Sequence, residues 1–150
     1  MGKSGEYFML MGEYHNHLDL KNRVVIPSKL REELGSFVVL TRGLDGALFL
    51  YSSETFKILT EKLISLSFTE KESRNITRLM VSGATTLEFD KQGRIIIPNF
   101  LKSYASLDKE VVIIGVLNRL EIWSREKWEE FVSLNADDLS DISIDLFRLN

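Results

Sequence analysis

The stretch Asp19-Leu-Lys-Asn-Arg23-Val-Val-Ile-Pro27 decides the fold, because it returns 71 residues later as Asp90-Lys-Gln-Gly-Arg94-Ile-Ile-Ile-Pro98. Around it, residues 12–30 and 83–101 agree at six positions, where about one match is expected by chance. The identical pairs are Gly12/Gly83, Asp19/Asp90, Arg23/Arg94, Ile26/Ile97, Pro27/Pro98 and Leu30/Leu101. An internal repeat of this kind determines the architecture, and we infer that the two halves of the chain are divergent copies of one unit.

The length of the chain favours one compact domain built from both copies. A chain of 150 residues suits one domain, whereas each half alone would bury too little surface to be more than marginally stable. We therefore expect the copies to share a core. The predicted division is a vector-derived leader at 1–8, a first repeat at 9–68, a linking helix at 69–82, a second repeat at 83–134 and an acidic tail or weak helix at 135–150.

The composition is that of an ordinary globular protein. With 44% hydrophobic and 27% charged residues, it excludes a disordered or collagen-like chain. There are no cysteines, which excludes a disulfide scaffold and a cysteine-ligated zinc site. The chain has no run of about 18 apolar residues, so we predict no membrane span and a cytoplasmic location.

The net charge of −3 is unevenly distributed along the chain. The last sixteen residues hold four acids and one base, so the rest of the chain is balanced. Basic residues gather near the repeated stretch, which suits a nucleic-acid-binding face, although solvated surface side chains would give the same pattern. They are Lys21, Arg23, Lys29, Arg31 and Arg42 in the first copy, and Lys91, Arg94, Lys102 and Arg119 in the second.

Each copy begins with the same predicted elements, two strands and a short helix, and the mixture gives an α+β fold. Two-residue turns at 21–22 and 92–93 would join the strands, because Asn and Gly tolerate positive φ. Such a turn would place Leu20 opposite Arg23, with Asp19 just outside. The prolines that follow suit the first turn of a helix. The predicted strands are 13–18, 23–26, 84–89 and 94–97, and the predicted helices are 27–34 and 98–105.

A hairpin and a capped helix complete each copy. Ser53 and Ser124 are the expected N-caps, because a serine hydroxyl accepts a hydrogen bond from a free N–H of the first helical turn. Between the copies, Thr69-Glu-Lys-Glu72 has the capping-box pattern and predicts a helix that ends at Gly83. The predicted hairpins join 37–41 to 47–51 and 111–116 to 120–123, and the predicted helices are 54–65 and 125–133.

Asp19 and Arg23 are four residues apart across the predicted turn. Asp19 can accept hydrogen bonds from turn N–H groups or brace the guanidinium, and a turn-stabilising role alone would explain the pair. The functional interpretation is that Asp19 holds the loop and orients Arg23 outward. A rigidly held guanidinium fits a phosphate or the O6/N7 edge of guanine, and a β-ribbon is one of the few elements that enters the DNA major groove. Two such tips related by a pseudo-two-fold axis would form a paired reader.

The complete pattern closely resembles that of a known family. Gly12-Glu-Tyr followed by Asp19-x-x-x-Arg23-x-x-x-Pro27, with its second copy from Gly83 to Pro98, is similar to the bacterial MraZ proteins of the AbrB-like, swapped-hairpin superfamily. The resemblance covers roughly residues 9–134. It implies a double-split, swapped-hairpin β-barrel in which each copy supplies half of the barrel. Two small departures are Asn22, where Gly is usual, and the apolar Leu20.

The resemblance also implies a function. It indicates a transcriptional regulator that binds double-stranded DNA, forms a homo-oligomeric ring and acts on the nucleoid at the promoter of the division and cell-wall gene cluster. We expect repression through short direct repeats, spaced about one helical turn or roughly 10 bp apart. The Asp-x-x-x-Arg loops contact DNA in the family, and we expect neighbouring side chains to assist. The expected DNA-binding residues are Asp19, Lys21, Arg23, Asp90, Lys91, Gln92 and Arg94.

Two rival interpretations remain open on the residues alone. His15 and His17 share a strand face and could bind a metal in a metal-dependent enzyme, but their counterparts Thr86 and Glu88 do not repeat the pair. The chain has no Ser-His-Asp arrangement or Gly-rich phosphate loop, so we predict no enzyme activity, no cofactor and no small-molecule substrate. The other alternative is a structural oligomer or protein-interaction module that does not bind DNA.

Overall fold

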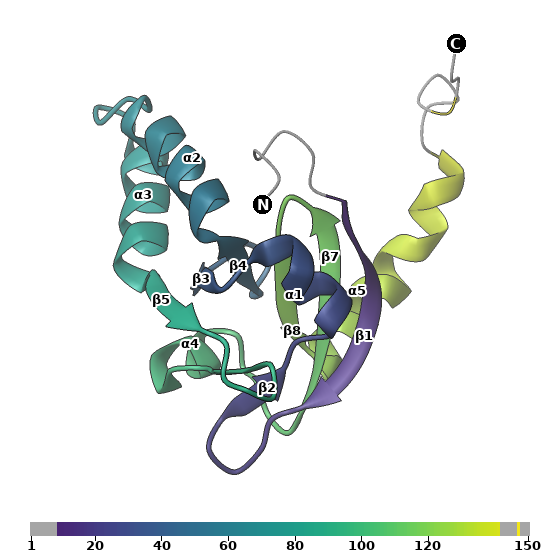
Figure 1. Cartoon of the computed structure of the whole chain (residues 1–150). Coiled ribbons are helices and arrows are strands. Elements are labelled where there is room, and N and C mark those ends of the chain that lie inside the picture. Colours follow the sequence, from purple (N-terminus) through teal and green to yellow (C-terminus); the bar gives the residue numbers. More distant parts are fainter. Residues whose placement is uncertain (1–8, 142–146, 148–150) are drawn as a thin grey trace.

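Six antiparallel strands form one sheet, and two short strands form a separate ribbon beside it (Figure 1). The computed structural model describes residues 9–141 and 147, so the predicted leader and half of the predicted tail lie outside the described residues. The ribbon pairs β2 (Arg23–Val25) with β6 (Arg94–Ile96). In order, the larger sheet contains β1 (Leu10–His17), β7 (Glu110–Leu117), β8 (Leu120–Ser124), β4 (Leu48–Ser52), β3 (Phe37–Arg42) and β5 (Thr85–Glu88).

The two copies exchange strands in both sheets. β1 of the first copy pairs with β7 of the second, while β5 of the second copy pairs with β3 of the first. β4 and β8 pair at the centre, so interchanging the copies reproduces the same strand order and a pseudo-two-fold axis passes between them. β1 and β5 are the edges of the sheet, and the pairings among the described strands do not close it into a barrel.

The ribbon covers a hydrophobic core that both copies supply. Val24 and Ile26 from the first copy and Ile95 and Ile97 from the second are at most 1% exposed and belong to one core cluster. Burying each such side chain stabilises the fold by about 1.5–3 kcal/mol. Because successive strand residues point to opposite faces, Val25 and Ile96 face outward. The core that the sequence predicts to be shared is therefore present, and the ribbon's outer face remains exposed.

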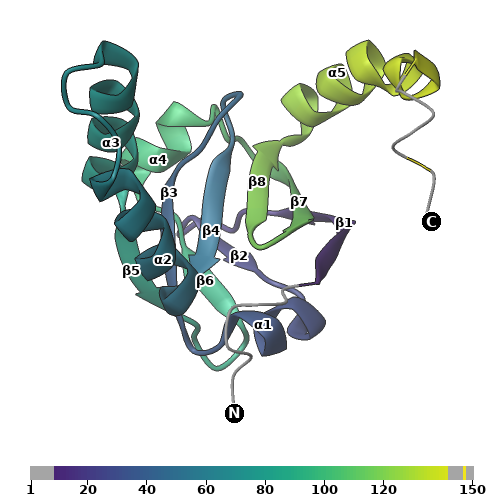
Figure 2. The same cartoon turned by 90° about the horizontal axis from the view of Figure 1, so that it is seen from above.

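The helices lie around the sheet. α2 and α3 form a hairpin on one side of it, and α5 projects from the opposite side (Figures 1 and 2). No helix within residues 9–141 is both long and apolar enough to cross a membrane. The helices are α1 (Ser28–Leu34), α2 (Ser53–Ile64), α3 (Lys71–Gly83), α4 (Asn99–Tyr104) and α5 (Arg125–Asn135), followed by the 3₁₀ helix η1 (Ala136–Asp141).

Two of the three predicted helix caps differ in the structure. Ser124 caps α5 as predicted, since its Oγ accepts a bond from the N–H of Lys127 at 3.1 Å. The cap of α2 is Ser52, not Ser53, because the Ser53 hydroxyl donates instead to the carbonyl of Phe37. The capping box predicted for α3 is wrong. Its N-cap is Glu70 with no side-chain bond, while the Thr69 hydroxyl pairs with that of Ser67. The helix does end at Gly83, as predicted.

Candidate nucleic-acid interface

Each repeated stretch forms a three-residue turn, one residue longer than predicted. The N–H of Asp19 donates to the carbonyl of Arg23, and the N–H of Asn22 donates to the carbonyl of Asp19, both at 3.0 Å. Asp19, not Leu20, therefore lies opposite Arg23. The second turn repeats these bonds at 3.0 and 2.9 Å. Asn22 and its counterpart Gly93 have φ of 60° and 76°. Each is therefore the residue in left-handed conformation that follows the type I turn of a three-residue hairpin loop.

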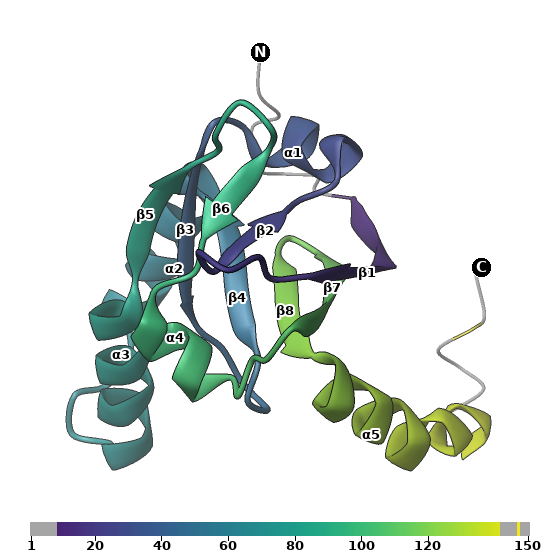
Figure 3. The ribbon, with the colours of Figure 1, turned by 90° about the horizontal axis from the view of Figure 1, so that it is seen from below.

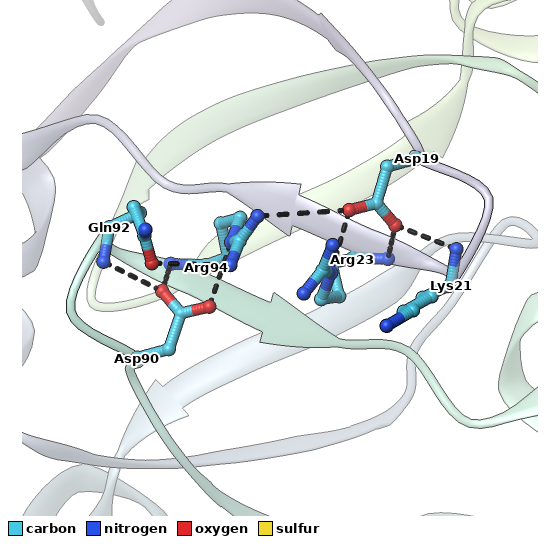
Figure 4. Close-up of polar contacts among 6 residues, drawn as sticks. All are labelled: Asp19, Lys21, Arg23, Asp90, Gln92 and Arg94. Atoms are coloured by element: carbon cyan, nitrogen blue, oxygen red, sulfur yellow. Dashed lines mark hydrogen bonds and ion pairs between the residues drawn. The ribbon is translucent and has the colours of Figure 1, made fainter.

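The aspartate side chain closes each turn. Asp19 Oδ1 accepts bonds from the backbone N–H groups of Lys21 and Arg23, both at 2.9 Å, and Oδ2 accepts from Arg23 Nε at 2.7 Å (Figure 4). Asp90 makes the equivalent three bonds within its own turn at 2.9, 2.8 and 2.7 Å. The N–H of Arg23 is the main cause that lowers the pKa of Asp19, and Arg94 acts in the same way on Asp90. Both carboxylates are therefore ionised at neutral pH.

The ribbon brings the two turns onto one surface. β2 and β6 run antiparallel, with Arg23 opposite Ile96 and Arg94 opposite Val25, so both arginines and both apolar residues share the outward face. The arginine side chains are 26% and 25% exposed. Arg94 Nη1 lies 4.0 Å from Oδ2 of Asp19, so the ion pairs of the two turns form one continuous row (Figure 4). Figure 3 shows this ribbon in front of the larger sheet.

The remaining predicted residues lie on the tips of the same turns. The side chains of Lys21 and Lys91 are exposed, as cations that meet a polyanion must be. Gln92 Oε1 accepts a hydrogen bond from Arg94 Nη2 at 3.2 Å. All seven residues predicted from the sequence therefore come together on the ribbon and its two turns.

Two basic residues that were not predicted for the site support the turns from behind. Lys102 Nζ of α4 donates to Asn22 Oδ1 at 3.0 Å. Arg31 of α1 lies against Gly93, where a Cβ atom would approach Arg31 Cζ to 2.4 Å. Each base thus contacts the turn of the other copy. Arg31 and Lys102 are equivalent at the 71-residue shift, and this equivalence is the signal that would have identified them.

The histidine pair gives no sign of a metal centre. His15 Nε2 lies 2.7 Å from Glu13 Oε2, and this hydrogen bond is the main cause that lowers the pKa of Glu13. In the described part of the chain, no group of three or more histidine, cysteine, aspartate or glutamate side chains is arranged to hold a metal ion. The alternative of a metal-dependent enzyme that uses His15 and His17 therefore gains no support from their geometry.

Comparison with known proteins gives the family. The model of the MraZ protein family, described as antitoxin-like, matches residues 9–79 and again residues 80–149. A relative from Clostridium tetani is 51% identical over 129 residues, covering 86% of this chain and 91% of its own. One from Limosilactobacillus reuteri is 50% identical over 138 residues, covering 92% and 97%. One from Thermoanaerobacter sp. strain X514 is 48% identical over 142 residues, covering 95% and 99%.

These three relatives carry the same name, Transcriptional regulator MraZ. Among solved structures, the solution structure of PHS018 from Pyrococcus horikoshii is 15% identical and covers 72% of this chain and 91% of its own, with a TM-score of 0.33, which is too low to bear on the fold. The two matches to the family model divide the chain into two repeats, and the identities to the relatives extend over nearly its whole length. The chain therefore belongs to the MraZ family, whose members are transcriptional regulators and not enzymes.

Proposed function

We propose that this regulator binds double-stranded DNA through the outward face of the β2–β6 ribbon. One observation carries the proposal. Two guanidinium groups, each held by an aspartate of its own turn, come from different copies of the repeat and lie side by side on one exposed two-stranded ribbon. A structural turn needs no such pairing across copies, and a ribbon of this kind fits the DNA major groove.

The chemistry of the ribbon suits recognition of DNA. Each Asp–Arg pair is electrically neutral, but the aspartate of each turn is bonded to Nε of the guanidinium rather than to its terminal amino groups. Those groups form the planar fork that matches guanine O6 and N7. Lys21 and Lys91 supply net positive charge at the tips and are suited to phosphate contacts.

We also propose a ring of identical subunits, with the contact formed by two different faces. α3 carries three bases and one acid, and exposes Ile76, Leu79 and Val81, which are 42–51% exposed. Helices α5 and η1 carry six acids and two bases, and expose Val132 and Leu134. The two faces lie on opposite sides of the molecule (Figure 2). Complementary faces of one chain form heterologous contacts, which generate a ring when the rotation closes.

An apolar groove on α3 supports this arrangement. Its walls combine apolar surface with two guanidinium groups, which suits an acidic, apolar helix such as α5 of a second copy. The groove is lined by Phe68, Arg74, Thr77, Arg78, Val81 and Ser82. Joining weak contacts in a ring raises overall affinity, so each subunit needs few contacts with DNA.

Membership of the family supports a proposal about the wider role. We propose that the protein acts in the cytoplasm on the nucleoid, and represses the division and cell-wall gene cluster by binding direct repeats in its promoter, about one helical turn or roughly 10 bp apart. We also propose that the sheet and ribbon together correspond to the double-split barrel of the swapped-hairpin superfamily. The exchange of strands between the copies supports that interpretation.

Fluorescence anisotropy with promoter DNA tests the proposal. We expect the parent chain to bind a fragment with short tandem repeats more tightly than unrelated DNA of equal length, and to bind more weakly as salt rises. Arg23→Ala should lose most of this specific binding, while Lys57→Ala removes an exposed positive charge on α2, outside the ribbon and its turns, and should retain it. Equal binding by Arg23→Ala and the parent would contradict the proposal and favour a structural oligomer without DNA binding.

A further inference from the structure

The two turns have the same backbone hydrogen bonds, but their arginine side chains are bound by different groups. Both aspartates make the same three bonds at nearly the same distances. Arg94 is bound by Asp90 and Gln92 and also lies near Asp19, so three oxygen-bearing side chains surround it. Arg23 is bound through Nε to Asp19, and no described residue is a partner of its terminal amino groups. The two arginine side chains are exposed to nearly the same extent. They therefore differ in the groups that bind them and not in their accessibility to DNA.

The tips of the two turns differ as well. Leu20 is fully exposed at the first tip, whereas Lys91 takes the equivalent position at the second. The next position is Lys21 in the first turn and Gln92 in the second. An exposed aliphatic side chain suits the methyl group of thymine, whereas an exposed ammonium suits phosphate. The first tip therefore combines a guanidinium bound to Asp19 through Nε with an exposed leucine beside Lys21, and the second combines a guanidinium bound to both Asp90 and Gln92 with Lys91 in place of that leucine.

We propose that each protomer binds its DNA box in one fixed direction, with the first turn reading bases and the second turn holding mainly the phosphate backbone. Arg23 is ready to pair with a guanine, whereas Arg94 must first leave Gln92 and move away from Asp19. If the side chains of the two turns were identical, the pseudo-two-fold symmetry of the backbone would favour a palindromic box. The differences between their side chains therefore set the direction in which the protomer binds the box. The inference rests on the proposed DNA-binding function and assigns different roles to its two halves.

Selection from a random double-stranded DNA library tests the direction, because a random library favours no particular box. We expect the parent chain to enrich a non-palindromic box whose most restricted positions lie to one side. The variant K91L/Q92K gives the second tip the chemistry of the first and leaves the net charge unchanged, so its box should approach an inverted repeat. The reciprocal variant L20K/K21Q also keeps the net charge, and should lose base preference on the side that the first turn reads.

Single arginine variants provide a second measurement on the selected box. Arg23→Gln should reduce discrimination against a changed guanine by about tenfold or more, the usual contribution of a bidentate arginine, and Arg94→Gln by clearly less. A palindromic box for the parent, or equal losses for the two variants, would overturn the inference while leaving DNA binding in place. Failure to enrich any sequence would instead contradict the proposed function, and the inference with it.

Discussion

At the residue scale, the two aspartates do not have equal roles. Asp19 binds Arg23 and also lies 4.0 Å from Arg94, whereas the described ion pairs of Asp90 involve only Arg94. We expect Asp19→Asn to lower DNA affinity more than Asp90→Asn, because it loosens the guanidinium groups of both turns. Anisotropy titrations of both variants with one promoter fragment measure the difference, and far-UV circular dichroism checks that each variant is folded.

Both aspartate substitutions remove one negative charge near the DNA, so a purely electrostatic role would strengthen binding equally in the two variants. Weaker binding in both, with the larger loss for Asp19→Asn, is the outcome expected from a positioning role. Equal losses would show that the 4.0 Å approach between Asp19 and Arg94 has no consequence for binding.

At the element scale, alternate residues of the ribbon serve different purposes. Those on the inner face stabilise the fold, and those on the outer face are available to contact DNA. Ile95 is 1% exposed and packs in the shared core, whereas its neighbour Ile96 is 56% exposed on the outer face. We expect Ile95→Ala to lower the free energy of unfolding by about 2–5 kcal/mol, and Ile96→Ala to change it by at most about 0.5 kcal/mol. Urea unfolding monitored by tryptophan fluorescence compares the two. Equal losses would mean that both faces of the ribbon are buried.

Some features of the helices, strands and turns could be predicted from the sequence, and others could not. Local chemistry was sufficient to predict the positive φ of Asn22, the short helices α1 and α4, and the serine cap of α5. Pro27 and Pro98, predicted to be the first residues of these helices, are their N-caps instead. The turn length was not predictable, because an Asn or Gly suits both a two-residue turn and the last position of a three-residue turn. The strand exchange is a contact between distant segments, and the repeat alone does not say which copy a strand pairs with.

In the candidate site too, local contacts could be predicted from the sequence, whereas contacts between the two copies could not. The Asp-x-x-x-Arg pairs are local, so the repeat identified them directly. The contacts of Arg31 with Gly93 and of Lys102 with Asn22 cross between the copies. They become visible only when β2 is known to pair with β6, because this pairing brings each helix to the turn of the other copy.

At the scale of the whole molecule, assembly through two different faces predicts a distinctive result for mixed variants. Leu79→Asp places a negative charge in the basic α3 face, where it repels the acidic α5 face, and Leu134→Lys places a positive charge in the α5 face, where it repels the α3 face; the two leucines are 51% and 70% exposed. Each variant alone lacks one of the two complementary faces, so we expect a monomer in each case. A mixture should form a dimer and nothing larger, because one intact α3 face meets one intact α5 face. Sedimentation analysis gives the masses.

The control is Leu44→Asp, which introduces the same charge as Leu79→Asp at a leucine that is 59% exposed and belongs to neither face, and it should keep the mass of the parent. If like faces paired instead, the mixture would contain no species that the separate variants lack. The mixed dimer joins only two subunits, so its affinity for tandem repeats should fall well below that of the parent, whereas Arg23→Ala should lose DNA binding with its mass unchanged. If DNA is bound by ribbons repeated around a ring, affinity should be lost both when assembly is disrupted and when Arg23 is removed from intact rings.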